Sequence, residues 1–400
     1  MTLRLGYLIP EFPGQTHIFF WREVRALRRM GEEVLLLSTR KPSLPICRHD
    51  FAPAAIAETH YLYPPSVRSF VDWATGGCQG FLRALAYLRG LKASPLKTQL
   101  YQYGLLLSAV DVLRWAHRER IDHIHVQSCA DAAHVVALAR LLGGPSYSLV
   151  LHGDLSVYGA DHRSKMKKAA FICVVGSHLR RQVLEHVGLP ADRVRVTFMG
   201  VETSELSTLG QDRTYTPGLL HLVTVARLHP AKGHMHALEA IHSGVNAGLN
   251  LRYTIAGEGP YRDAILSRIE ALGMTDRVKM VGTLSESEVN KLLSKADAML
   301  LTSTGKGEAW PVSVMEAMGA GLPVIASVIG ATSEMITSGE DGLLVPQRDQ
   351  RAILECIKLL SLDIQKRRNI GAAARSTAQR CFDVSERANM LRNAIRNTAR

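Results

Sequence analysis

Short apolar runs alternate with longer amphipathic segments along the chain, and this alternation restricts the fold more than any other feature of the sequence. Parallel strands that are covered on both faces are typically short and continuously apolar, and helices connect them. Thirteen runs have this strand character: 3–9, 33–38, 59–63, 122–126, 147–151, 171–175, 194–198, 219–226, 251–257, 277–282, 297–302, 322–327 and 342–346. Segments of helical character lie between them, among them 16–30, 67–90, 98–120, 129–142, 234–247 and 260–272. The pattern predicts an α/β fold of parallel sheets flanked by helices.

Chain length and a polar connecting segment predict two domains. A chain of 400 residues is longer than a single hydrophobic core usually supports. The segment 200–218 is polar, contains turn residues and lacks apolar periodicity, so we interpret it as a linker. We therefore expect two doubly wound, Rossmann-like domains at residues 1–205 and 206–382, followed by a basic helical segment at about 383–400.

Basic residues are concentrated in the first half of the chain. The whole sequence has 48 lysines and arginines and 36 aspartates and glutamates, which gives a formal net charge of +12. Residues 1–200 hold 25 basic and 15 acidic side chains, whereas residues 201–400 hold 23 and 21. This excess favours an anionic partner for the first half: a membrane surface, a nucleic acid or a phosphorylated substrate.

The cysteines and the apolar segments indicate the cell compartment in which we expect the protein. The six cysteines are scattered without a short-spaced pair, a pattern that does not indicate a disulfide framework or a zinc site. The apolar run at the N-terminus is too short for a signal peptide, and no stretch reaches the ~18 apolar residues of a membrane-spanning helix. We therefore expect a cytoplasmic protein, with the inner face of the cell membrane as a surface on which it can lie.

The most informative segment for chemistry is 305–327, which follows a predicted strand. A loop with two glycines leads to Pro311, a residue suited to the first turn of a helix, and we expect that helix to run from about 311 to 320. The free N–H groups of Val312 and Ser313 would then form an anion site that the helix dipole reinforces.

Two glutamates belong to the same segment. Glu308 lies in the loop before the helix, and Glu316 lies on its otherwise apolar surface. A carboxylate in apolar surroundings is stable only when it accepts hydrogen bonds, and sugar hydroxyls are suitable donors. Either glutamate alone is better explained by a structural role, but the combination with the helix start favours a binding site.

Other unusual residues also follow predicted strands, where ligands bind in such sheets. Arg227 and Lys232 form a cation pair suited to a diphosphate. His152 directly follows the strand 147–151, and Asp154 comes two residues later. Taken singly, such residues are more often structural or solvated.

Glycines mark two further loops. Gly14 lies in the proline-rich loop after the first strand and permits close approach of a ligand to the backbone. The basic, aromatic segment 16–30 beyond it is consistent with a solvated helix face or a lipid-facing one. Gly257 and Gly259 form a strand-to-helix turn on which a flat base can rest.

Several motifs are absent from the sequence. It contains no Asp-x-Asp, so the usual carboxylate pair that holds a metal-bound nucleotide sugar is missing. It also lacks a P-loop and G-x-S-x-G, and no G-x-G-x-x-G follows the first strand. We therefore expect no metal and no other cofactor.

The motifs that are present, in the order in which they follow one another along the chain, resemble those of the retaining glycosyltransferases of sequence family 4, which have the GT-B fold. The resemblance covers nearly the whole chain and is strongest over 219–346. Glu308-x7-Glu316 followed by AMGAGLPVIAS is similar to the family signature, and VARLHPAKG is similar to its phosphate motif. IAGEGP, DGLLV and LHGD also match, as do the stretches VGTLSESEVNKLLSKADAMLLTS and FICVVGSHLRRQVLEHVGLPADRVRVTFMGVE.

The resemblance implies two Rossmann-like domains facing across a cleft, with the C-terminal helix packed back on the first. It also implies a role for each site residue. The donor-binding residues would be Gly14, Arg227, Lys232, Gly257, Gly259, Leu284, Glu308, Val312, Ser313 and Glu316. Among them, Arg227 and Lys232 would bind the diphosphate, Glu308 the sugar hydroxyls and Glu316 the ribose. His152 would face the sugar, and the catalytic residues would be His152, Glu308, Arg227 and Lys232, with Asp154 on the acceptor side.

Two positions depart from the family pattern. Glu202 stands where an aspartate is usual, and the loop FPGQTHIF replaces a two-glycine form, which weakens the donor-binding assignment of Gly14. This loop is closer to that of members that make exopolysaccharides, such as the colanic-acid type.

The resemblance therefore implies transfer of a hexose-type sugar from a UDP- or GDP-sugar to an acceptor hydroxyl, with retention. A glycan or lipid-linked glycan would be the acceptor, and the basic first half would meet an anionic membrane surface. Two alternatives stay open: a nucleotide-sugar epimerase with the same fold, and a non-catalytic nucleotide-sugar binding protein. A nucleic-acid partner suits the charge, but the sequence has no platform of stacking aromatic residues, so we expect none.

Overall fold

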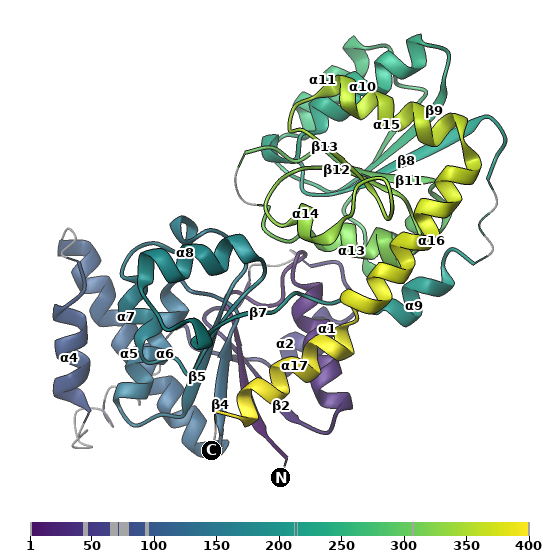
Figure 1. Cartoon of the computed structure of the whole chain (residues 1–400). Helices are drawn as coiled ribbons and strands as arrows, with labels where there is room; N and C mark the ends of the chain where they lie inside the picture. Colours follow the sequence, from purple (N-terminus) through teal and green to yellow (C-terminus); the bar gives the residue numbers. More distant parts are fainter. Residues whose placement is uncertain are drawn as a thin grey trace. The chain divides into compact units, whose positions relative to one another are not determined.

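The computed structural model describes residues 2–42, 47–64, 71, 80–92, 96–211, 213, 215–305 and 308–398. The chain forms two compact units (Figure 1). Unit 1 comprises Met1–Cys47, Phe51–Phe198 and Arg387–Arg400, and unit 2 comprises Arg48–Asp50 and Met199–Glu386. Residues 67–70 and 72–79 of the predicted helical segment 67–90 lie outside the described residues, as do Lys306 and Gly307 of the glycine-containing loop.

Unit 1 is built on a parallel sheet with the strand order β3-β2-β1-β4-β5-β6-β7. Its strands are β1 (Arg4–Ile9), β2 (Glu33–Ser38), β3 (His60–Tyr61), β4 (His123–Val126), β5 (Ser146–Leu151), β6 (Ile172–Val174) and β7 (Val194–Val196). β1 pairs with β2 on one side and with β4 on the other, so the direction of winding reverses between β1 and β4. In doubly wound sheets, ligands bind beyond the carboxyl ends of the strands at this point.

Helices follow the strands of unit 1, as the sequence pattern predicts. They are α1 (Ile18–Arg29), α2 (Ala52–Glu58), α4 (Phe81–Arg89), α5 (Leu96–Arg118), α6 (Asp131–Leu141), α7 (His162–Lys167) and α8 (Ser177–Val187). The last helix of the chain, α17 (Val384–Arg396), begins in unit 2 and belongs to unit 1 from Arg387 onward.

Unit 2 repeats the architecture with a parallel sheet in the order β10-β9-β8-β11-β12-β13. Its strands are β8 (Leu219–Val225), β9 (Asn250–Ala256), β10 (Val278–Gly282), β11 (Ala298–Leu301), β12 (Val324–Ser327) and β13 (Leu343–Val345). Its helices are α9 (Thr203–Thr208), α10 (His234–Asn246), α11 (Arg262–Ala271), α12 (Glu286–Lys295), α13 (Val312–Gly319), α14 (Thr332–Met335), α15 (Gln350–Leu362) and α16 (Ile364–Cys381). The reversal lies between β8 and β11, which are paired.

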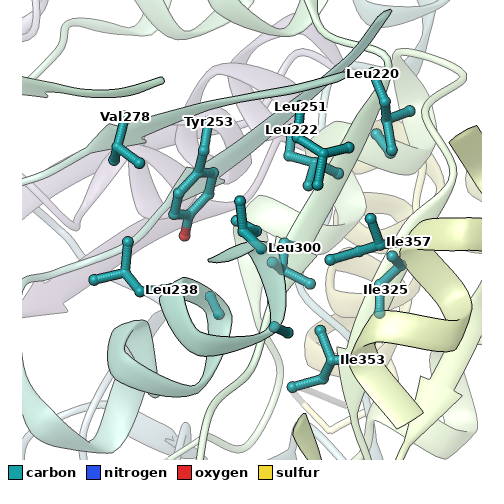
Figure 2. Close-up of a cluster of buried hydrophobic side chains, with 14 of the residues drawn as sticks. Leu220, Leu222, Leu238, Leu251, Tyr253, Val278, Leu300, Ile325, Ile353 and Ile357 are labelled. Atoms are coloured by element: carbon teal, nitrogen blue, oxygen red, sulfur yellow. The ribbon is translucent and has the colours of Figure 1, made fainter. Parts of the chain in front are cut away.

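One face of the unit 2 sheet packs on α10 and α15 and forms a closely filled apolar core (Figure 2). Leu222, Leu300 and Ile325 project from three strands toward Leu238 of α10 and Ile353 of α15. The central strand β11 is buried along its whole length because α13 covers the other face. Burial on both faces explains why these strands are continuously apolar in sequence.

The structure confirms all thirteen predicted strands, with ends that differ from the prediction by at most two residues. The prediction of a linker at 200–218 is partly wrong, because this segment contains α9. Leu206 of α9 is buried, and the helix packs on α13 and α16 within unit 2. The segment is therefore partly a packed element of unit 2. Within the described part of the chain, no helix is long and apolar enough to cross a lipid bilayer.

Candidate active site

Residues predicted to bind the donor meet at the carboxyl edge of the unit 2 sheet. Arg227 and Lys232 follow β8, whereas Glu308 and the start of α13 follow the adjacent strand β11. The two groups are far apart in the sequence. They meet at one edge of the sheet because β8 and β11 are paired in parallel. This is the position at which doubly wound sheets bind ligands.

The side chains of Lys232 and Glu308 form a hydrogen-bonded ion pair between Nζ and Oε2. They are only 15% and 10% exposed, so the pair is largely shielded from water. The hydroxyl of Ser303, just beyond β11, donates to the same carboxylate oxygen over 2.8 Å. Two donors therefore hold Oε2, while Oε1 has no hydrogen-bond partner among the residues that the structure describes. Ser303 is not among the residues that the sequence motifs predict, although its position after a buried strand is a usable signal.

Backbone contacts fix the loop that carries Lys232 against the loop that leads to Glu308. The N–H of Thr304 donates to the carbonyl of Ala231 over 2.8 Å, and the hydroxyl of Thr302 donates to the carbonyl of Gly233 over 2.8 Å. Gly233 has a φ of +69°, and a Cβ there would lie 1.8 Å from the carbonyl oxygen of Thr302. Only glycine permits this approach.

The helix α13 begins one residue later than predicted, and Pro311 is its N-cap residue. No side chain caps this end, so the N–H groups of Val312 and Ser313 are placed to bind an anion. Glu316 is buried on α13, at 7% exposure. Gly330 packs closely against the loop before the helix. Its φ is +56°, and a Cβ there would lie 1.8 Å from the carbonyl oxygen of Glu308. Gly330 is not among the residues that the sequence motifs predict.

The predicted glycine turn packs on the backbone that carries Arg227. Gly257 has a φ of +144°, and a Cβ there would lie 1.9 Å from the carbonyl oxygen of Ala226. Gly259 has a φ of +157°, and its Cβ would lie 2.3 Å from the carbonyl oxygen of Leu228. The side chain of Arg227 itself is exposed and makes no hydrogen bond or ion pair within the described residues. Leu284 follows β10 at the same edge of the sheet.

His152, Asp154 and Gly14 belong to unit 1. Nε2 of His152 lies 2.8 Å from Oε1 of Gln127, and its ring packs edge-on against Phe19 and Phe20. Burial and the nearby ring of His17 lower the pKa of His152 to about 3, so the ring is neutral near pH 7.

Gly14 and Asp154 have local partners. Gly14 accepts from the N–H of His17 over 2.9 Å, and a Cβ there would lie 2.8 Å from the His17 ring. Asp154 accepts from the side-chain amide of Gln182 over 2.6 Å, a bond that ties its loop to α8. These contacts explain structurally why a glycine stands at position 14 and an aspartate at position 154. That Gly14 binds the donor and that Asp154 lies on the acceptor side stay predictions.

Part of the basic face predicted for α1 is engaged within unit 1. Arg22 is 2% exposed, and Arg28 donates to the carbonyl of Val34 and to Glu58 over 2.7 and 3.1 Å. The guanidinium of Arg28 also lies over the ring of Trp21. Arg22 and Arg28 are therefore engaged within unit 1, whereas Arg29 on the same helix is exposed.

A surface pocket of unit 2 contains none of the predicted site residues. Its lining includes Arg252, Arg277, Lys279, Lys295 and Asp297, which lie at the amino-terminal edge of the sheet. The chemistry described above belongs to the opposite, carboxyl edge.

The chain is similar to glycosyltransferases along most of its length. The family model for glycosyltransferase family 4 matches residues 18–205, and the model for glycosyl transferases group 1 matches residues 218–377. A protein of Escherichia coli K12 named as a colanic acid biosynthesis glycosyltransferase is 28% identical over 95% of this chain and 96% of its own. A protein of Erwinia amylovora named as an amylovoran biosynthesis glycosyltransferase is 27% identical, with coverage of 90% and 91%.

Solved structures share the fold at low identity. A glycosyltransferase from Rickettsia africae superposes with a TM-score of 0.74 at 15% identity, over 99% of this chain and 98% of its own. The Anabaena protein HepE in complex with UDP superposes with a TM-score of 0.73 at 18% identity, over 99% and 100%.

Proposed function

The chain belongs to the family 4 glycosyltransferases, with the GT-B fold, and from this premise we propose that it moves a hexose-type sugar from a UDP- or GDP-sugar to an acceptor hydroxyl with retention of configuration. The acceptor is a glycan or lipid-linked glycan of exopolysaccharide or other cell-surface glycan assembly. The names of the relatives from Escherichia coli and Erwinia amylovora support this setting, and the complex of HepE with UDP supports a nucleotide-sugar donor.

The observation that carries the proposal is the Lys232–Glu308 pair beside the uncapped start of α13. A nucleotide sugar has an anionic diphosphate next to a ring of hydroxyls. Such a ligand satisfies both members of the pair at once, because Lys232 and the N–H groups of Val312 and Ser313 attract phosphate while Oε1 of Glu308 accepts from hydroxyls. The exposed guanidinium of Arg227 adds a second, forked cation for the diphosphate.

The same groups account for the reaction step that we propose. As the bond between the anomeric carbon and the phosphate oxygen breaks, negative charge develops on the departing diphosphate. Arg227, Lys232 and the start of α13 stabilise that charge without reorganising, which is the most effective form of electrostatic catalysis. The acceptor hydroxyl forms its bond to the same face of the anomeric carbon, and its proton passes to the departing phosphate oxygen. This sequence retains the configuration and uses no covalent nucleophile or metal.

The direct test replaces each cation. Arg227→Ala and Lys232→Ala should each lower turnover by about 10²–10³-fold, as for the loss of one preorganised donor worth ~3–4 kcal/mol. Lys279→Ala is the control, because this exposed lysine lies at the opposite edge of the same sheet. Near-normal transfer in both cation variants would overturn the proposed site.

A second experiment identifies the donor and separates the alternatives. A thermal-shift screen with UDP, GDP and their common sugars finds the nucleotide, because a ligand that binds only the folded state raises its melting temperature. Incubation with the stabilising nucleotide sugar alone should leave the sugar unchanged. An isomerised sugar would instead indicate an epimerase, and binding without transfer to any glycan acceptor would indicate a non-catalytic protein.

We also propose that unit 1 lies on an anionic membrane surface at the cytoplasmic face. The basic excess of residues 1–200 supports this, and so does α4, where Leu82 is 78% exposed beside the exposed Arg83 and Arg89. Each basic residue near anionic lipid contributes ~1 kcal/mol. Co-sedimentation with vesicles should therefore rise with the fraction of anionic lipid and fall in an Arg83→Ala, Arg89→Ala variant. Binding that ignores anionic lipid would remove the membrane proposal and leave the glycosyltransferase assignment intact.

A further inference from the structure

The side chain of Gln347 connects two loops at the carboxyl edge of the unit 2 sheet. Its Oε1 accepts from the N–H of Gly305 over 2.8 Å, and its Nε2 donates to the carbonyl of Val328 over 3.0 Å. Gly305 lies in the loop after β11, and Val328 directly follows β12. These two strands are neighbours in the sheet. One side chain from the loop after β13 therefore forms a bridge between the loops that follow the two preceding strands.

The two partners of this Gln347 bridge explain why the residue is a glutamine. The N–H of Gly305 can only donate a hydrogen bond, and the carbonyl of Val328 can only accept one. A side-chain amide has both an acceptor oxygen and a donor nitrogen, so it satisfies the two groups at once. A glutamate offers only acceptors and a lysine only donors, so neither could form the bridge.

The loop that carries Gln347 is itself fixed at both ends. At its start, the carbonyl of Val345 on β13 accepts from the N–H of Val328 over 2.9 Å. At its end, Asp349 is the N-cap residue of α15, and its side chain accepts a backbone N–H of that helix. Between them, Arg348 has a φ of +64°, a left-handed conformation that is unfavourable for a residue with a side chain. The position of Gln347 is therefore determined by β13 and α15.

The loops that the bridge connects contain the backbone on both sides of Glu308. Before Glu308, the hydroxyl of Ser303 donates to its Oε2 over 2.8 Å, and Ser303 lies two residues from the bridged glycine. After Glu308, the carbonyl of Ala309 accepts from the N–H of Ala331 over 3.0 Å. Ala331 belongs to the loop after β12, to which Gln347 is also hydrogen-bonded. The bridge therefore joins the two loops that fix the surroundings of the carboxylate.

We propose that Gln347 is a positioning residue, which through this bridge keeps the Glu308 carboxylate on Lys232 and leaves its Oε1 available to the hydroxyls of the donor sugar. The role toward the sugar rests on the proposed glycosyltransferase function. The bridge and its effect on the ion pair between Lys232 and Glu308 do not.

Amide hydrogen exchange in the full chain tests the bridge. Gln347→Met removes both hydrogen bonds and keeps the length of the side chain. The N–H of Gly305 should then exchange about tenfold faster, because its acceptor is lost. Gln350→Met is the matched control, since that exposed side chain makes no hydrogen bond among the residues that the structure describes. Equal exchange of the Gly305 amide in the two variants would overturn the bridge.

Chemical labelling tests the effect on the ion pair. The amine of Lys232 is only 15% exposed and is paired with Glu308, so acetic anhydride should modify it slowly. In Gln347→Met its acetylation, followed by peptide mass spectrometry, should be several-fold faster, whereas that of the exposed Lys279 should stay the same. If Lys232 reacts at the same rate in Gln347→Met and Gln350→Met, Gln347 does not position Glu308.

Kinetics test the role toward the sugar. With the nucleotide sugar that raises the melting temperature, Gln347→Met should lower kcat roughly fivefold, as for the loss of neutral hydrogen bonds. Affinity for the free nucleoside diphosphate should change much less, because Arg227 and the start of α13 are outside the bridge. A kcat equal to that of Gln350→Met would refute this role. If the unmodified protein transfers no sugar, the proposed function is at fault, and exchange and labelling still decide the bridge.

Discussion

At the scale of single residues, the orientation of the Glu308 carboxylate depends on Ser303 as well as on Lys232. Both donate to Oε2, which turns the carboxylate so that Oε1 is available. Ser303→Ala should lower turnover about tenfold, because a hydrogen bond to a charged group contributes ~1.5–3 kcal/mol. Ser243→Ala is a matched control, since that exposed hydroxyl bonds only to its own helix. Equal turnover in both variants would show that Lys232 alone orients Glu308.

The candidate donor-site residues could be predicted from the sequence, whereas the side chains that are hydrogen-bonded to His152 in unit 1 could not. Arg227, Lys232 and Glu308 each stand out because a charged residue shortly after a buried strand is unusual. Tyr7 and Gln127 lie 120 residues apart, Tyr7 within a strand and Gln127 directly after one, and neither is conspicuous in the sequence. Only the pairing of β1 with β4 brings them together, so no local sequence pattern predicts their hydrogen bond.

At the scale of elements, the turn between β9 and α11 sets the backbone under Arg227. Gly257→Ala should reduce the free energy of unfolding by more than about 3 kcal/mol, because the residue has a φ of +144° and its Cβ would overlap the carbonyl oxygen of Ala226. Gly248→Ala is the control: its φ is +87°, but a Cβ there meets no atom within 4 Å. It should cost only ~1–2 kcal/mol. Equal losses in urea denaturation would contradict the close contact.

Strands were predicted more accurately than the short helix α9, for a physical reason. A parallel strand covered on both faces has to be apolar at every position, as β11 is, so its sequence reveals it. α9 has six residues and buries little more than Leu206 and Thr203 against unit 2. One buried leucine and one buried threonine in a polar stretch give no periodic signal, so the sequence pattern predicts a linker.

At the scale of the whole molecule, the chain returns to unit 1 within α17. Glu32, whose side chain is fully buried in unit 1, accepts from the N–H of Leu3 over 2.7 Å and pairs with Arg396. The apolar residues Leu391 and Ile395 of the same helix are buried as well. The crossing point at Arg387 lies inside a regular helix, so helical periodicity gives no sign of it.

Removing an apolar contact of α17 should therefore loosen unit 1 selectively. Leu391→Ala deletes a side chain that is 2% exposed and should destabilise unit 1 by ~2–5 kcal/mol. Hydrogen-exchange mass spectrometry should show faster exchange in β1 and β2, with unchanged rates in β8. Leu362→Ala, at a residue 76% exposed, should change neither. Unchanged exchange in β1 and β2 would show that α17 contributes little to unit 1.

The stability of unit 1 should fall on acidification because several of its histidines are buried as neutral rings. Burial lowers the pKa of His17 and His134 to about 4, and that of His123 and His152 to about 3. Between pH 6.5 and 4 the unfolded chain therefore binds protons that the folded state does not, and the free energy of unfolding decreases as the pH falls. Glu23 acts in the opposite direction, because burial raises its pKa to about 7 and its folded form takes up a proton first.

Four histidines outweigh one glutamate, so the net slope in urea denaturation should be positive between pH 4 and 6.5. His123→Gln should reduce that slope by up to ~1.4 kcal/mol per pH unit, the share of one proton. His117→Gln should leave it unchanged, since His117 is exposed. A slope that is the same in both variants would mean that burial does not hold His123 neutral between its hydrogen-bond partners Ser146 and Ser148, which lie 2.7 and 2.8 Å from its ring nitrogens.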